Sequence, residues 1–277
     1  MVISNIPFSE DFGRANALRI LEKFRPRFSC FNDDIQGTGI VALAAVLAGL
    51  HVSHIRQEDA RIVVFGAGSA GIGVSSRIAA NIAVQANKPI QEARKQIWYV
   101  SHPKFLLLSL SLSSILIFYR CLDKQGLLLK SQGDQLTEGQ APFAREDNEW
   151  PNNAGTDLLS VVKIVKPHVL LGLSTRGGSF TEEIVREVSR HVETPIIMPL
   201  SNPSRLHEAE PKDINVWSDE RALIATGSPF PPLERHGRKY EIGELGLKSF
   251  RFSLLRLTSA MQPSVTIQHP SPELVLG

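Results

Sequence analysis

The stretch Arg61–Gly73 constrains what this chain can fold into more than any other stretch. Its first part, Ile62–Phe65, is a short run of β-branched and aromatic residues, which predicts a buried strand. The run ends in Gly66, Gly68 and Gly71, which have the spacing G-x-G-x-x-G. The helix that should follow is marked by apolar residues at helical spacing: Val74, Ile78 and Ile82.

A strand, a tight glycine turn and a helix together form a cradle for phosphate. The first N–H groups of a helix have no partner within the helix, and the helix N-terminus carries a partial positive charge. In this pattern Gly66 permits the turn, Gly68 lets a pyrophosphate approach the backbone, and Gly71 lets helix and strand pack closely. The pattern predicts dinucleotide binding; the alternative is a tight turn that holds no ligand.

Strands and helices alternate along the rest of the chain. Further buried strands are expected at Gln96–Trp98, His168–Leu173, Pro195–Leu200 and Ala222–Thr226. This alternation predicts an α/β fold with a doubly wound, mostly parallel sheet. Because ligands bind beyond the carboxyl ends of such strands, we expect Ser174, Asn202 and Gly227 near the cofactor. The alternative for Asn202 is a turn residue before a proline.

Two acidic pairs near the N-terminus are expected to converge. A helix over Phe12–Phe24 would climb roughly 20 Å, and a strand over Arg27–Asn32 would cover about the same distance. If Pro26 reverses the chain, Asp33–Asp34 returns beside Glu10–Asp11. Four adjacent carboxylates need a cation or a shifted protonation to offset their repulsion, and oxygen ligands favour Mg²⁺ or Mn²⁺. The alternative is two solvated acidic turns.

The composition limits the partners and the compartment. The chain has 277 residues and a net charge of +2, and no basic stripe is visible, so nucleic-acid binding is not expected. Cys30 and Cys121 are the only cysteines and stand in no metal or redox spacing. Met1–Ile6 shows no signal peptide, and cytoplasmic and mitochondrial locations both stay open.

The sequence divides into three parts. Residues 1–50 would carry the acidic pairs and a buried helix, because Gly37–Leu50 is apolar all round. Residues 51–244 would form a Rossmann-like dinucleotide-binding domain. Residues 245–277 give no clear element and form a tail.

The segment Tyr99–Arg120 interrupts the expected domain. Residues Phe105–Tyr119 are uncharged and biased toward serine and leucine, and they are too short for a membrane span, which needs about 20 residues. In dinucleotide-binding domains an acidic residue at the end of the second strand commonly follows the glycine turn by about 20 residues. Removing the segment would join Trp98 to Asp123 and bring the separation between Gly66 and Asp123 closer to that spacing. We interpret the segment as an insertion or a translated intron; a lipid-contacting hairpin is the alternative.

Five motifs in order resemble those of malic enzymes, over about Pro7–Trp98 and Leu122–Glu244. They are Glu10-Asp11-Phe12, Phe31-Asn-Asp-Asp-Ile-Gln-Gly-Thr38, Gly66-Ala-Gly68, Leu200-Ser-Asn-Pro203 and Thr226-Gly-Ser-Pro-Phe230. Malic enzymes oxidise malate with NAD or NADP, release pyruvate and CO₂, and are typically homo-oligomers. The resemblance implies the same activity and fold here, without a membrane or nucleic-acid partner.

The resemblance also implies roles for matching residues. The divalent metal ligands would be Glu10, Asp11 and Asp34, and Asp33 would support the catalytic base. Asn202 would contact malate, while its cofactor contact and that of Ser174 follow from their place beyond the strand ends. The pyrophosphate cradle would comprise Gly66, Ala67, Gly68, Ser69, Ala70 and Gly71.

The choice of cofactor depends on the acid after the second strand. Such an acid binds the ribose hydroxyl and repels a 2′-phosphate, so Asp123 predicts NAD over NADP. Lys124 and Lys130 could still serve a phosphate, which keeps NADP open.

The sequence also departs from the family. The family's catalytic tyrosine, catalytic lysine and a substrate arginine precede the Glu10-Asp11 motif and have no counterpart here. We therefore expect this chain to bind NAD and a metal but to turn over malate poorly by itself. Two hypotheses stand: a malic enzyme or a fragment of one, and a non-catalytic NAD-binding module. A dehydrogenase without a metal would leave the acidic pairs unexplained.

Overall fold

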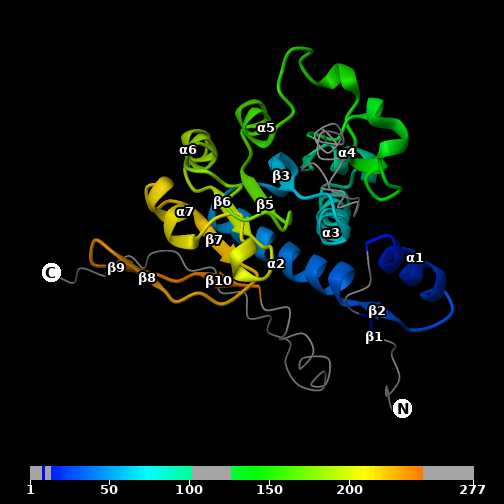
Figure 1. The fold of residues 1–277 in the computed structure, drawn as a ribbon, viewed down its shortest axis with the longest axis horizontal. Coiled ribbons are helices and arrows are strands. Elements are labelled where there is room, and N and C mark those ends of the chain that lie inside the picture. Colours follow the sequence, from blue (N-terminus) through cyan, green and yellow to red (C-terminus); the bar gives the residue numbers. More distant parts are fainter. Residues whose placement is uncertain (1–7, 10–13, 102–125, 246–277) are drawn as a thin grey trace, which may run out of the picture.

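A six-stranded parallel sheet forms the centre of the molecule, with helices on both of its faces (Figure 1). The structure is a computed structural model that describes residues 8–9, 14–101 and 126–245. The strands are β1 (Phe8–Ser9), β2 (Phe31–Asn32), β3 (Ile62–Phe65), β4 (Ile97–Val100), β5 (Val169–Gly172), β6 (Ile196–Pro199), β7 (Leu223–Thr226), β8 (Leu233–Arg235), β9 (Arg238–Tyr240) and β10 (Gly243–Glu244). The helices are α1 (Arg14–Phe24), the π-helix η1 (Asp33–Gly37), α2 (Thr38–Val52), α3 (Ser69–Gln85), α4 (Ile90–Arg94), α5 (Leu158–Val165), α6 (Glu182–His191) and α7 (Pro211–Trp217), with short 3₁₀ turns between them.

The strand order identifies the point where the chain reverses its direction across the sheet. The order is β10-β7-β6-β5-β3-β4, and all neighbours are parallel. From β3 the chain runs outward to β4 and then returns to add β5 on the other side of β3. The loops that follow β3 and β5 therefore leave the sheet side by side at its carboxyl edge, where open α/β sheets bind ligands. The predicted doubly wound fold is confirmed.

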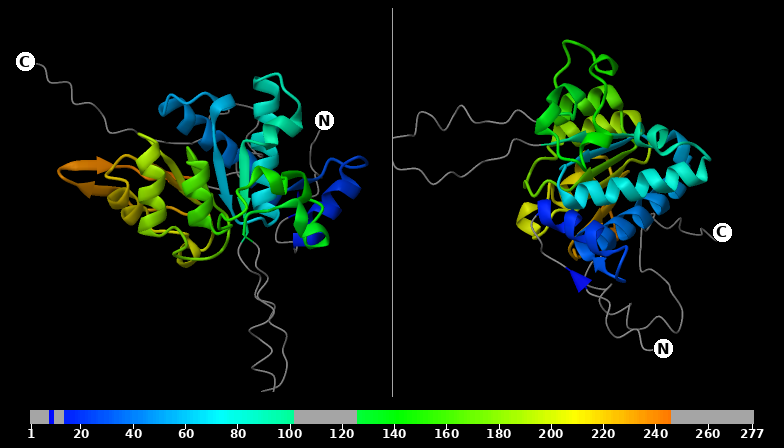
Figure 2. Two further views of the ribbon diagram at one scale, coloured as in Figure 1. Left: turned by 90° about the horizontal axis from the view of Figure 1, so that it is seen from above. Right: turned by 90° about the vertical axis from the view of Figure 1, so that its right-hand side faces the viewer.

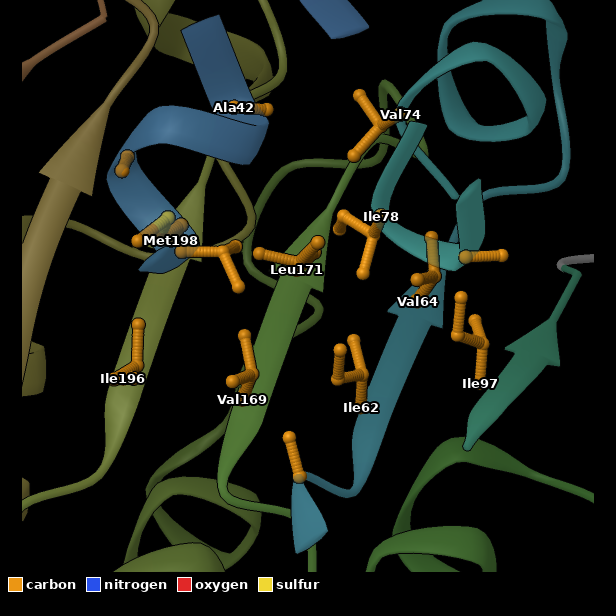
Figure 3. Close-up of a cluster of buried hydrophobic side chains, with 14 of the residues drawn as sticks. Ala42, Ile62, Val64, Val74, Ile78, Ile97, Val169, Leu171, Ile196 and Met198 are labelled. Atoms are coloured by element: carbon orange, nitrogen blue, oxygen red, sulfur yellow. The ribbon is translucent and has the colours of Figure 1, made fainter. Parts of the chain in front are cut away.

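Alternate residues of each strand feed two separate core layers. Ile62 and Val64 of β3 point toward α2 and α3, where they meet Ile78 and the neighbouring strands (Figure 3). Val63 and Phe65 point the other way, into a layer formed with α5, α6 and α7. The strands are buried on both faces, which is why their sequences read as continuous apolar runs.

Helix α2 is the apolar helix that the sequence predicts, and it packs against α3 and the sheet. Its Gly49 lies so close to β6 that an added Cβ would stand 2.9 Å from Ile196 Cδ1. By length and composition alone, the stretch Ile35–Val52 is apolar enough to cross a membrane. Its contacts with the sheet are those of a core helix.

Two of the predicted boundaries need correction. Tyr99 and Val100 are not part of an insertion outside the sheet, because they complete β4 and pair with Val64 and Phe65. The predicted tail begins one residue too early, because the side chain of Leu245 is buried in the core and its N–H donates to Thr226 O. Residues 102–125 and 246–277, with the remainder of both predicted segments, lie outside the described residues.

Opposite ends of the molecule carry two elements that stand apart from the sheet. The antiparallel β8–β9 hairpin projects at one end and α1 lies at the other (Figure 2). Helix α1 contacts α3 and β2, so it lies beside the helix that follows the glycine turn.

Candidate functional site

The glycine turn between β3 and α3 has a shape that only glycine allows at two positions. Gly66 has a φ of 115°, in the region that side chains rarely adopt. Gly71 lies in the first turn of α3, where an added Cβ would overlap the carbonyl oxygen of Gly66. The helix therefore begins directly against the end of β3, as it does in turns that bind a pyrophosphate.

The cradle combines this turn with the N-terminus of a long helix. Helix α3 has 17 residues and Gly68 as its N-cap. Gly68, Ser69 and Ala70 are half-buried. A helix start of this kind offers backbone N–H groups and a favourable field to a pyrophosphate. The predicted cradle residues thus stand together at the switch point of the sheet.

Gln140 supports the cradle from a distant segment. Its Nε2 donates to the carbonyl oxygen of Ala67 at 2.9 Å, and its side chain is buried. Tyr99 of β4 donates its hydroxyl to the carbonyl oxygen of Gly71. Neither residue was expected from the sequence, because each acts on a backbone atom that is far away along the chain.

The loop after β5 lies directly against the glycine turn. A Cβ on Gly66 would stand 2.6 Å from the backbone nitrogen of Ser174. Ser174 is buried, and its hydroxyl donates to Glu208 and accepts from the backbone N–H of Arg176. The structure therefore brings Ser174 next to the cradle, with its hydroxyl directed at the protein interior.

The loops after β6 and β7 place Asn202 at the same edge. Asn202 is exposed, precedes a cis proline at Pro203 and accepts a hydrogen bond from Ser228 Oγ at 2.6 Å. A Cβ on Gly227 would stand 2.8 Å from Asn202 Nδ2, so this loop packs tightly against the amide. The exposed amide at the carboxyl edge is suited to bind a polar ligand.

Two buried polar residues behind these loops were missed by the sequence reasoning. Glu208 is 0% exposed, and its Oε1 accepts hydrogen bonds from both loops. His207 packs against Phe230 with a ring separation of 5.2 Å. Burial lowers the pKa of His207, although Glu208 and Glu210 act in the opposite direction. Both residues follow β6 in an irregular segment, where no periodic pattern marks them.

The predicted metal segment is described only in part. β1 and β2 are parallel, with Phe8 opposite Phe31 and Ser9 opposite Asn32. Asn32 caps η1 by accepting from the N–H of Ile35, and Asp33 is buried at its start. Glu10, Asp11 and the cofactor candidate Asp123 lie outside the described residues, as does the side chain of Asp34. Within the described part alone, no group of three or more metal-binding side chains occurs.

Sequence comparisons assign the chain to a family. The family described as "Malic enzyme, NAD binding domain" matches residues 35–110 and 113–252, so the match runs through most of the predicted insertion. An NAD-dependent malic enzyme of Schizosaccharomyces pombe is 45% identical over 85% of this chain and 38% of its own length. A malolactic enzyme of Lactiplantibacillus plantarum is 42% identical over 85% of this chain and 39% of its own length. The chain thus spans less than half the length of these relatives.

Solved structures share the fold. The NAD-dependent malic enzyme of Thermotoga maritima matches with a TM-score of 0.57 and 21% identity, over 82% of this chain and 49% of that chain. The malic enzyme of Entamoeba histolytica matches with a TM-score of 0.54 and 22% identity, over 81% of this chain and 39% of that one. With its glycine turn at the switch point of a parallel sheet and a family match over most of its length, the chain belongs to the malic enzyme family and carries that family's NAD-binding domain.

Proposed function

We propose that this chain serves the oxidative decarboxylation of malate to pyruvate and CO₂, with NAD as the hydride acceptor and a divalent cation. The observation that carries the proposal is the glycine turn of Gly66–Gly71, which opens beside the loop of Ser174 at the carboxyl edge of the sheet. The names of the relatives support NAD and malate. The alternative is a module that binds NAD without turnover.

The residues of the cradle fit NAD. The backbone N–H groups around Gly68–Ala70 would hold the pyrophosphate at the start of α3. Asn202 would donate its amide to malate or to the cofactor, and Ser174 would shape the wall between them. NAD would accept the hydride from C2 of malate while a base takes the hydroxyl proton.

The acidic segment supports a metal site. Parallel strands end at the same edge, so the register of β1 and β2 leads the chain into Glu10 from one strand and into Asp33 from the other. Carboxylate oxygens from Glu10, Asp11 and Asp34 would suit Mg²⁺ or Mn²⁺. Such an ion would supply Lewis-acid polarisation to the substrate oxygens.

NAD binding to the full chain tests the cradle. Isothermal titration should give saturable binding that Gly66→Ala weakens by at least tenfold. Gly237→Ala is the matched control, because Gly237 also has a positive φ of 73° but lies in the β8–β9 turn. Loss of affinity in both variants, or in neither, would contradict the proposed cradle.

Metal and malate tests separate the two functions. Asp34→Asn should remove Mn²⁺ binding measured by titration, while the exposed Asp134→Asn should not. Malate-dependent formation of NADH that requires Mn²⁺ supports the enzyme. NAD binding without binding of Mn²⁺ and without NADH formed would favour the non-catalytic module, whereas binding of both without NADH fits the poor turnover expected of this chain by itself.

A further inference from the structure

Glu208 joins the two loops that border the cofactor cradle. Its Oε1 accepts hydrogen bonds from Ser174 N at 2.9 Å, Ser174 Oγ at 2.7 Å and Ser201 Oγ at 2.6 Å. Ser201 Oγ in turn accepts from Thr175 N at 2.8 Å. One carboxyl group therefore fixes the backbone after β5 and the backbone after β6.

The burial of this carboxyl group is unusual for a residue with a stabilising role alone. Glu208 is 0% exposed, and no Lys or Arg in the described part of the chain forms an ion pair with it. Its Oε2 has no hydrogen-bond partner among the described residues. Carboxyl groups are rarely buried without a cation, because removing the charge from water has a large cost. A well-packed apolar side chain at this position would avoid that cost.

The sheet makes room for this group at one position. Gly172 is the last residue of β5, and a Cβ there would stand 2.8 Å from Glu208 Cγ and overlap the carboxyl group. The backbone of Glu208 and its neighbour also pairs with the same loop, because Gly178 N donates to His207 O and Phe180 N donates to Glu208 O. The segment after β6 is thus built around the loop after β5.

Both loops lead directly to the proposed site. The backbone of Ser174 touches the glycine turn, since a Cβ on Gly66 would stand 2.6 Å from Ser174 N. Ser201 is covalently joined to Asn202, whose exposed amide stands at the carboxyl edge. A shift of the carboxyl group would move both the wall of the cradle and the amide.

We infer that Glu208 is a positioning residue that sets the affinity for NAD by holding Ser174 and Ser201 in place. The inference rests on the proposed NAD site. Glu208 is fully buried, so it would act through the backbone of Ser174 and through the residue before Asn202. The role of Glu208 is therefore to hold the loops that border the NAD site, and not only to fill the hydrophobic core.

The test uses the full chain and three variants. Because three hydrogen bonds converge on Oε1, Glu208→Ala should raise the dissociation constant for NAD by about tenfold or more. Glu208→Gln keeps an acceptor oxygen at the same reach and should give an intermediate value. Gly172→Ala leaves the carboxyl group intact but displaces it, so it should weaken NAD binding as well.

A matched control separates positioning from stability. Val185→Ala removes volume from a fully buried position on α6, away from the cradle. It should lower the unfolding temperature and leave the affinity for NAD unchanged. If the affinity instead follows the unfolding temperature through all four variants, Glu208 has a structural role only and the inference is wrong.

A second measurement does not require NAD. Amide hydrogen exchange at Ser174 and Thr175, whose N–H groups point at Glu208 and Ser201, should accelerate in Glu208→Ala and less in Glu208→Gln. Unchanged exchange would overturn the positioning role. If the unmodified chain binds no NAD, the proposed cofactor site fails, and the exchange rates still decide whether Glu208 holds the loops.

Discussion

The phenol of Tyr99 joins the second strand of the sheet to the glycine turn. Its ring is 1% exposed and packs edge-on against Phe143, and its hydroxyl donates to Gly71 O. Burial raises the pKa of Tyr99 well above its usual value, so the hydroxyl keeps its proton and remains a donor at physiological pH.

Tyr99→Phe removes this hydrogen bond without changing the packing. We expect the free energy of unfolding, measured with urea, to fall by about 1 kcal/mol. Tyr240→Phe is the matched control, because Tyr240 donates to Glu220 at the more exposed β9 strand and should cost less. An equal loss in both variants would show that the bond to Gly71 contributes nothing special.

Residues differ in how far the sequence predicts them. The roles of Gly66 and Gly71 were predictable, because the glycine spacing marks positions where the local backbone excludes a side chain. In the structure Gly66 has a positive φ, and Gly71 lies in close contact with Gly66 O. Glu208 was not, because its partners Ser174 and Ser201 are 34 and 7 positions away and meet it only in the folded chain. The roles of Asp33 and Asn202 stay predictions that rest on the family.

At the scale of elements, α3 connects the cradle to the acidic segment. Gly73 lies on the face of α3 that packs on η1, and an added Cβ would stand 2.7 Å from Ile35 O. Because Gly73 has no side chain, α3 can contact η1, the π-helix that contains Asp33 and Asp34.

Gly73→Ala puts two effects in opposition. Alanine favours a helix over glycine by roughly 0.5–1 kcal/mol, but overpacking against backbone typically costs about 1–3 kcal/mol. We expect a net loss in the free energy of unfolding. Ala80→Gly, at an exposed position of the same helix, measures the propensity effect alone. If Gly73→Ala raises the free energy of unfolding by as much as Ala80→Gly lowers it, the added methyl group does not clash with η1.

His168 links the residue before β5 to the residue before β3 by a hydrogen bond, and it makes the free energy of unfolding depend on pH. Its Nδ1 accepts from Arg61 N at 3.1 Å. Burial and then the charge of Arg61 lower the pKa of His168 to about 4, against 6.5 in the unfolded chain. Between these values the unfolded chain binds a proton that the folded chain does not, so stability is present above about pH 6.5 and falls as the pH drops toward 4.

His168→Asn tests this contribution, because Asn Oδ1 can accept from Arg61 N but does not titrate. The loss in free energy of unfolding between neutral pH and pH 4 should be smaller in the variant by about 1–2 kcal/mol, after allowance for the partly exposed site. The comparison uses urea unfolding at both pH values. Parallel pH profiles for the two proteins would contradict the assignment.

The elements themselves were mostly predictable, and the exceptions have physical causes. The strands of the sheet are buried on both faces, so β3, β5, β6 and β7 stand out as apolar runs. β10 has only two residues and carries no such run. The boundary of β4 was misjudged because joining Trp98 to Asp123 assigned Tyr99 and Val100 to the insertion, although both residues pair within the sheet.

At the scale of the whole molecule, the cradle lies where the two halves of the sheet meet. The strands β3 and β4 form one half, and β5, β6 and β7 lie on the other side of the switch point. A ligand that contacts the turn after β3 and the loop after β5 therefore holds both halves together. Such a ligand should stabilise the folded chain as a unit, because it binds the folded state and not the unfolded one.

NAD should stabilise the chain more than NADP does. At a free concentration 100 times the dissociation constant, NAD should raise the free energy of unfolding by about 2.7 kcal/mol. NADP at the same concentration should raise it less, since an acid at Asp123 would repel the 2′-phosphate. Lys130, one of two cations that could favour NADP, is paired with Glu146. Asp123→Asn should bring the effects of the two cofactors closer together in thermal unfolding, and the Gly66→Ala variant should respond less than the unmodified chain to both. A larger rise in the unfolding temperature with NADP than with NAD in the unmodified chain would show that Asp123 does not select the cofactor. Lys124 and Lys130 would then be the candidates for binding the 2′-phosphate.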